Sequence, residues 1–204
     1  MAAELDKLAQ YYRAKQNAPR ADFYTVLAVE ERANKTPESF SEGLVLPEGV
    51  IRLSDLTIGG MKPKELEKAL IAEGHEVSDY AKYLLKSPDF TTLSDKQTIS
   101  LIRTTVSAMG LAGNPTTDQI YEKANELGWD LCPAEVGPHL RLAYKDQPMY
   151  EWLSIGMKQI AGRDGSPNVF RVPRNDDGSW LSGNWAEPTR LWLPTDQLVF
   201  SPRK

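Results

Sequence analysis

A chain of 204 residues with 41% hydrophobic and 25% charged residues can bury a core, which argues against wholesale disorder. The net charge of −4 and the pI near 5.3 argue against a general nucleic-acid binder. The sequence has a single cysteine, no apolar signal segment near its start and no apolar run of the roughly eighteen residues that span a membrane, so we expect a cytoplasmic protein.

The N-terminal segment predicts two helices. Leu5, Leu8 and Tyr12 recur at near-helical spacing and predict a helix over residues 4–16. A second helix is predicted to begin after Asp22, which is a suitable N-cap.

The next segment mixes strands with helices. Apolar residues around a Pro-Glu-Gly turn predict a hairpin or two short strands over residues 44–53. Pro63 at a first helical position and Gly74 after a last turn predict a helix between them. Ser78 can cap a further short helix, whose predicted buried residues are Tyr80, Ala81, Leu84 and Leu85.

A second strand and helix follow. The β-branched residues at 98–106 predict a strand, and Thr116 with Gln119 predicts a capping box for a helix that ends at Gly128. This unit looks like the preceding one, because each runs from a strand through a glycine loop and a helix to a glycine and a short extended link. Their alignment needs gaps, so an ancient duplication and two generic strand–helix units both stay open.

From His139 onward the pattern changes to short strands. Residues 139–144 alternate apolar and polar side chains, and Gly137-Pro138 should stop any preceding helix, so we expect a strand that begins at His139. Further strands are predicted in "WLSIGMKQI", "VFRVPR", "SWLSGNW" and "QLVF", with Asn-Asp-Asp-Gly as a hairpin turn.

These elements predict an α+β protein. A helical N-terminal half with short strands should precede an antiparallel β-meander of about five strands. The predicted lobes are residues 1–130, mainly helical with the candidate duplicated units, and residues 131–204, an antiparallel β lobe that contains most of the tryptophans.

One short stretch gathers the residue types of a cysteine-dependent active site. A nucleophilic cysteine needs a lowered thiol pKa and a nearby base, and Cys132, Glu135 and His139 are candidates for these roles. Free cysteines are more often buried and inert, so we favour a packed Cys132. The sequence has no nucleophile elbow, zinc-protease helix, Walker loop or dinucleotide fingerprint.

Tryptophans are concentrated near the C-terminus, where they predict a binding surface. Trp185 and Trp192, beside a Gly-Asn pair and a proline-containing loop, are the better candidates for exposure. We group them with Asn184, Arg141 and Arg171, because exposed Trp with Arg and Asn is typical of protein and glycan contact surfaces. The alternative is that these tryptophans fill the core of a small β domain.

A winged-helix reading is the third alternative. The helix that begins after Thr116, the segment that follows it and the later hairpins superficially suit that fold. A Gly-Pro pair inside the would-be recognition helix, the lack of basic residues there beyond Arg141 and the net negative charge argue against it.

The block Leu-Cys-Pro-Ala-Glu-Val-Gly-Pro at residues 131–138, with the Leu-Arg-Leu and Asp-Gln-Pro motifs that follow, resembles a group of uncharacterised bacterial proteins of similar length. The resemblance covers roughly Glu73 to the C-terminus and is most specific between Cys132 and Pro148. It implies a shared fold and a natural bacterial protein, and it supplies no activity, cofactor or catalytic residue.

The leading hypothesis is a non-enzymatic binding protein that contacts an unknown protein or a small polar ligand through the C-terminal β lobe. The alternatives are a cysteine-dependent enzyme centred on Cys132 and His139, and a DNA-associated winged-helix-like factor. With one cysteine and two histidines in the chain, a structural zinc site is not expected. We expect no other metal and no cofactor. We also expect no membrane contact, and nucleic acid is the least favoured partner.

Overall fold

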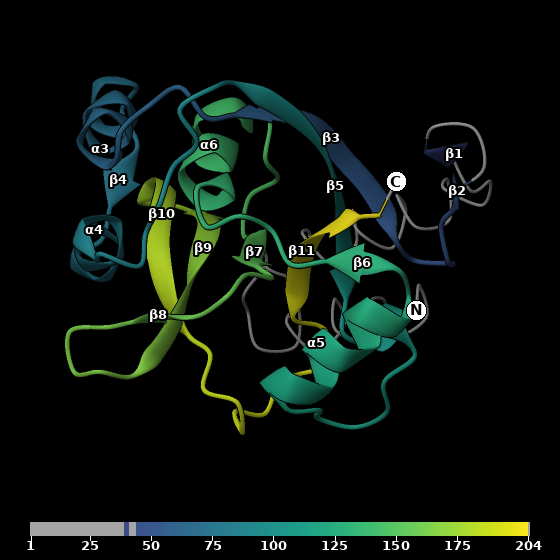
Figure 1. Cartoon of the computed structure of the whole chain (residues 1–204). Helices are drawn as coiled ribbons and strands as arrows, with labels where there is room; N and C mark the ends of the chain where they lie inside the picture. The colour runs from purple at the N-terminus through teal and green to yellow at the C-terminus, as the bar shows by residue number, and fades with distance from the viewer. Residues whose placement is uncertain (1–38, 41–43, 204) are drawn as a thin grey trace.

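Residues 39–40 and 44–203 are described in a computed structural model (Figure 1). The two helices predicted in the N-terminal segment lie outside these residues. The described elements are, in chain order, β1 Ser39–Phe40, β2 Leu44–Val45, β3 Ile51–Ile58, α3 Pro63–Ala72, β4 Glu76–Val77, α4 Asp79–Lys86, β5 Gln97–Thr105, the 3-10 helix η1 Ser107–Met109, α5 Thr117–Glu126, β6 Trp129–Asp130, α6 Val136–Ala143, β7 Trp152–Ile155, β8 Ile160–Ala161, β9 Pro167–Asn175, β10 Gly178–Trp185 and β11 Gln197–Pro202.

A mixed sheet of nine strands forms the centre of the molecule. Its strand order is β3-β5-β11-β7-β9-β10-β4, with β6 paired to β11 and β8 paired to β9. The last strand of the chain, β11, therefore lies between β5 and β7, antiparallel to the first and parallel to the second. The pair β10–β4 is also parallel, and the other pairs of this sheet are antiparallel.

The protein is α+β, with a sheet rich in antiparallel pairs. The predictions of a helical N-terminal half and of an antiparallel C-terminal meander are both wrong. The long strands β3 and β5 come from the segment that was expected to be mainly helical. The C-terminal strands do not form a meander, because β11 pairs with β5 and β7. Four successive residues of β11 are buried, as expected for a strand with neighbours on both sides. The division into lobes at residue 130 stays a prediction, and the sheet takes strands from both sides of that position.

Several local predictions are confirmed. The side chain of Ser78 accepts a hydrogen bond from the backbone N–H of Ala81 and caps α4. Thr116 and Gln119 form the predicted capping box of α5. The Asn-Asp-Asp-Gly turn joins β9 to β10. Of the two alternatives for residues 44–53, two separate strands form and the hairpin does not, because β2 pairs with β1 and β3 pairs with β5.

The two similar units have the predicted succession of elements. Each has a long strand, a helix, a glycine with positive φ (77° at Gly74 and 78° at Gly128) and a strand of two residues. The short strands dock at different places, since β4 pairs with β10 and β6 pairs with β11. A common origin of the units stays a prediction.

The prediction of a strand that begins at His139 is wrong, because this segment lies in helix α6. Pro138 is in the first helical turn, where a backbone N–H has no partner within the helix, so proline does not interrupt it. Gly137 allows a close approach to the sheet: a Cβ atom there would lie 2.6 Å from Cβ of Phe170 on β9. The alternating pattern of residues 139–144 reflects a buried helix.

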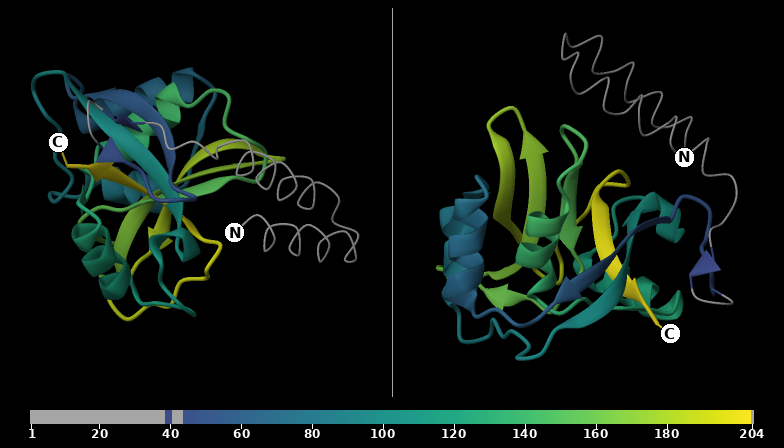
Figure 2. Two further views of the ribbon diagram at one scale, coloured as in Figure 1. Left: turned by 90° about the vertical axis from the view of Figure 1, so that its right-hand side faces the viewer. Right: turned by 90° about the horizontal axis from the view of Figure 1, so that it is seen from above.

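Helices cover both faces of the sheet. Helix α6 lies against Phe170 on one face, and Tyr121 of α5 contacts Phe200 on the opposite face, with ring centroids 6.4 Å apart. The strand register places the two phenylalanines on opposite faces, because side chains alternate along each strand. Helices α3 and α4 lie together beyond β10, far from α5 and β6 (Figures 1 and 2).

The contact between Gly156 and Phe200 fixes how closely the chain after β7 approaches β11. A Cβ atom at Gly156 would lie 2.2 Å from Cε1 of Phe200. We expect Gly156→Ala to lower the free energy of unfolding by about 1–3 kcal/mol in guanidinium denaturation, as overpacked cores do. Phe200→Leu should cost less in the Gly156→Ala background than in the wild type, and strictly additive effects would contradict this contact.

Candidate functional site

The Cys132 thiol, which is the nucleophile of the cysteine-dependent alternative, is buried. Cys132 precedes α6, its Sγ lies 3.7 Å from the carbonyl oxygen of Val199, and its backbone N–H donates to Gly156. Burial raises the pKa of the Cys132 thiol far above its ordinary value. Both properties oppose thiolate formation, so the preference for a packed Cys132 is confirmed.

Glu135, the N-cap of α6, and His139 within that helix face each other. The carboxylate of Glu135 is buried and accepts hydrogen bonds from the backbone N–H groups of Gly59 and Leu93, at 3.1 and 3.0 Å. Nε2 of His139 lies 3.4 Å from Oε2 of Glu135. The contacts of Cys132 are with β11 and the end of β7, whereas the contacts of this pair are with loops that flank α3 and α4.

Thiol chemistry provides a direct check. We expect Cys132 to react with an aromatic disulfide reagent only at the rate of protein unfolding in native buffer, and rapidly in guanidinium, because the folded state hides the sulfur and disfavours the thiolate. The measurement is the release of the coloured thiolate over time. Rapid reaction of the folded protein near neutral pH would restore the cysteine-dependent enzyme hypothesis.

The predicted binding residues do not share one exposed surface. Trp185 is 48% exposed, whereas the expected exposure of Trp192 is wrong, because only 2% of it is accessible. The Trp192 indole N–H donates to Oγ1 of Thr117 at 2.9 Å. Asn184 is buried and donates to Ser154. The guanidinium of Arg171 lies over the ring of Trp152, 4.3 Å from its centroid.

Arg141 belongs to a buried polar network. Its guanidinium donates to the backbone oxygen of Tyr144 and to Oε1 of Gln147, and burial lowers its pKa to about 10. Nε2 of Gln147 donates to the carbonyl oxygens of Glu151 and Val172, at 3.2 and 2.9 Å. The Glu151 side chain forms a buried ion pair with Arg103 of β5. The network therefore fixes the connection between α6 and β7.

The buried pair gives a stability prediction. Glu151→Ala removes the carboxylate that faces the buried Arg103, so we expect a loss of about 3–5 kcal/mol in the free energy of unfolding. Glu122→Ala, on the exposed side of α5, should change it by less than about 0.5 kcal/mol. Chemical denaturation monitored by tryptophan fluorescence measures both, and equal effects would contradict a structural role for the pair.

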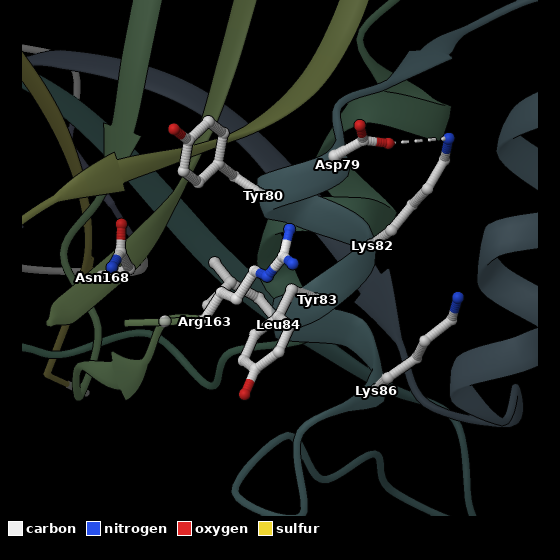
Figure 3. A pocket seen from close by; sticks show the side chains of 9 residues that line it. Asp79, Tyr80, Lys82, Tyr83, Leu84, Lys86, Arg163 and Asn168 are labelled. Atoms are coloured by element: carbon white, nitrogen blue, oxygen red, sulfur yellow. Dashed lines mark hydrogen bonds and ion pairs between the residues drawn. The ribbon is translucent and has the colours of Figure 1, made fainter. Parts of the chain in front are cut away.

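A groove between α4 and the turn from β8 to β9 combines exposed aromatic and cationic side chains (Figure 3). Its cavity of about 530 Å³ is lined by Asp79, Tyr80, Lys82, Tyr83, Leu84, Lys86, Gly162, Arg163 and Asn168. Tyr80 is 69% exposed and Tyr83 43%. In Figure 3 the guanidinium of Arg163 lies between the two tyrosines. We call this set of residues the α4 groove.

Packing against β10 explains which side of α4 faces the groove. Ala81, Leu84 and Leu85 are its buried residues. The backbone N–H of Ser78, its N-cap, donates to the carbonyl oxygen of Leu181 at 3.0 Å. A Cβ atom at Gly183 of β10 would lie 3.0 Å from Cβ of Tyr80, so the helix backbone sits close to the strand. The tyrosines are therefore held on a fixed helix.

The expected burial of Tyr80 is wrong, and the α4 groove was missed for that reason. Helical spacing does contain a signal, because residues 81, 84 and 85 form one stripe and Tyr83 points away from it. The contribution of Arg163 has no local signal, since it comes from a turn that is distant in sequence.

The charge of the α4 groove favours anions. Lys82, Lys86 and Arg163 outnumber the single carboxylate of Asp79, in a chain whose net charge is −4. Asp79 lies 3.4 Å from Nζ of Lys82, and this exposed pair is weakened by solvent. The groove thus offers two phenol rings and an excess of positive charge to a ligand.

The described part of the chain has no group of three or more acidic, His or Cys side chains placed to hold a metal ion. No helix within residues 44–203 is long and apolar enough to cross a membrane. Comparison with known protein families, with curated proteins and with solved structures yields no match. The resemblance to a bacterial protein group and the cytoplasmic location stay predictions.

Proposed function

We propose that the chain is a non-enzymatic binding protein and that the α4 groove takes an acidic segment of a partner protein. The observation that supports this proposal is the pair of exposed tyrosines, Tyr80 and Tyr83, beside three cationic side chains. Exposed aromatic rings on a fixed helix can gain contact area with little loss of side-chain freedom.

Size and charge favour such a ligand. A cavity of about 530 Å³ is in the range of sites that enclose a few side chains. Lys82, Lys86 and Arg163 complement carboxylates of a partner, which speeds encounter and selects against basic partners. The surface differs from the one predicted around Trp185 and Trp192, because Trp192, Asn184 and Arg141 are all buried.

The alternatives have less support. The buried Cys132 thiol, with its raised pKa, disfavours a cysteine-dependent enzyme. The segment that would read DNA as a recognition helix is α6, six of whose eight residues are buried. Single-stranded nucleic acid could stack on Tyr80 and Tyr83, but the groove offers only three cationic side chains for the phosphate contacts that drive such binding.

Fluorescence anisotropy with a labelled peptide rich in Asp, Glu and Leu tests the proposal. We expect binding at low salt that weakens at about 0.15 M salt, because exposed charges are screened. Tyr80→Ala combined with Tyr83→Ala should weaken it at least about tenfold, as the loss of aromatic anchors does. Lys86→Glu combined with Arg163→Glu should abolish it.

Lys158→Glu is the matched control, because Lys158 is exposed and outside the α4 groove. It should bind the peptide as the wild type does. Unaltered peptide binding by both groove variants, or no wild-type binding at low salt, would contradict the proposal. Tighter binding of labelled oligothymidylate than of the peptide would replace the protein partner with a single-stranded nucleic acid.

A further inference from the structure

The segment that carries α3, β4 and α4 runs from the end of β3 to the start of β5, and its two ends lie together in a narrow neck. Its two ends meet where the backbone N–H of Gly60 donates to the carbonyl oxygen of Leu93 at 2.9 Å. Gly59 has a φ of 86°, and a Cβ atom there would lie 2.2 Å from the carbonyl oxygen of Asp95. The neck is therefore a close backbone contact that only glycine permits at this position.

One carboxylate holds both ends of the neck. Oε2 of Glu135 accepts the N–H of Gly59, and Oε1 accepts the N–H of Leu93. Glu135 is buried at the start of α6, so each of these N–H groups would lose its partner if the carboxylate moved. Helix α6 thereby fixes the segment that presents the α4 groove.

His139 lies one helical turn further along and is 8% exposed. Its Nε2 is 3.4 Å from the same oxygen that accepts the N–H of Gly59, and it has no well-aligned hydrogen-bond partner among the described residues. Glu135 is the charged group that faces it. Arg141 points instead to Tyr144 and Gln147.

We propose that Glu135 and His139 form an acid-sensitive clasp, in which proton uptake by His139 loosens the neck between Gly59 and Leu93. The clasp rests on the burial of His139 and on the contacts that Glu135 makes with the neck. Only its effect on ligand binding at the α4 groove rests on the proposed function. When the neck opens locally, a charged His139 can reach water. The same opening breaks the hydrogen bonds that the N–H groups of Gly59 and Leu93 donate to Glu135.

The direction of the effect follows from the pKa of His139. Burial lowers this pKa below its ordinary value and outweighs the opposing attraction of Glu135. The closed neck therefore favours neutral His139. Its stability is complete above the ordinary histidine pKa of about 6.5 and is lost as the pH falls toward the lowered value. Uptake of one proton limits the change in the opening constant to about tenfold per pH unit.

Amide hydrogen exchange of the full chain without ligand tests the clasp. After correction for intrinsic exchange rates, protection of the Gly59 and Leu93 amides should fall between about pH 7.5 and about pH 5.5, by no more than about tenfold. His139→Gln should remove this pH dependence. His75→Gln is the matched control, because His75 is the other histidine of the chain, its pKa is also lowered, and it interacts with Arg141, Lys145 and Glu73.

The His75→Gln variant should keep the pH-dependent loss of protection at the neck. Equal wild-type protection at both pH values, or a loss that persists in His139→Gln, would overturn the proposal. If His139→Gln does not fold, NMR titration of the His139 ring in the wild type takes its place: the neck amides should then change with the midpoint of that ring, and different midpoints would overturn the clasp. These readouts need no peptide, so failure of the clasp and failure of the α4 groove are separate results.

Discussion

The structure depends on polar side chains that α6 buries at its two ends. Glu135 at its start holds the neck of the α3–α4 segment, and Arg141 near its end holds the turn that leads to β7 through Gln147. Burying such groups without partners would cost several kcal/mol each, so they persist where hydrogen bonds replace water. Because these bonds have fixed directions, they set where the loops lie, which apolar contacts alone do not.

The residues that hold the fold together around α6 are different from the residues for which we propose a binding function. Cys132, Glu135, His139 and Arg141 crowd together in sequence. Cys132, Glu135 and Arg141 each have a contact that helps to fix the junction between the helices and the sheet, and His139 faces Glu135. The same junction presents α4 at one end of the sheet with Tyr80 outward. The proposed binding surface is the α4 groove, and its position depends on the buried helix α6, which lies much later in the sequence.

Much of the secondary structure could be predicted, because its signals are local. Ser78 and Thr116 cap helices through atoms three residues away, and the turn before Gly178 joins two neighbouring strands. The prediction was wrong for α6, since Pro138 is harmless in a first helical turn but resembles a helix stop in sequence. It was also wrong for Tyr80 and Trp192, whose exposure depends on packing partners far along the chain.

The sequence by itself determined the capped helices, the apolar strands and a composition that disfavours nucleic acid, and it favoured a packed Cys132. Only the tertiary structure decided that β11 lies between β5 and β7, that Glu135 joins Gly59 to Leu93, and that Arg163 lies beside the tyrosines of α4. The physical reason is range. Caps and turns act over three or four residues, whereas strand order and the α4 groove arise from burial and hydrogen bonds between segments that no local pattern relates.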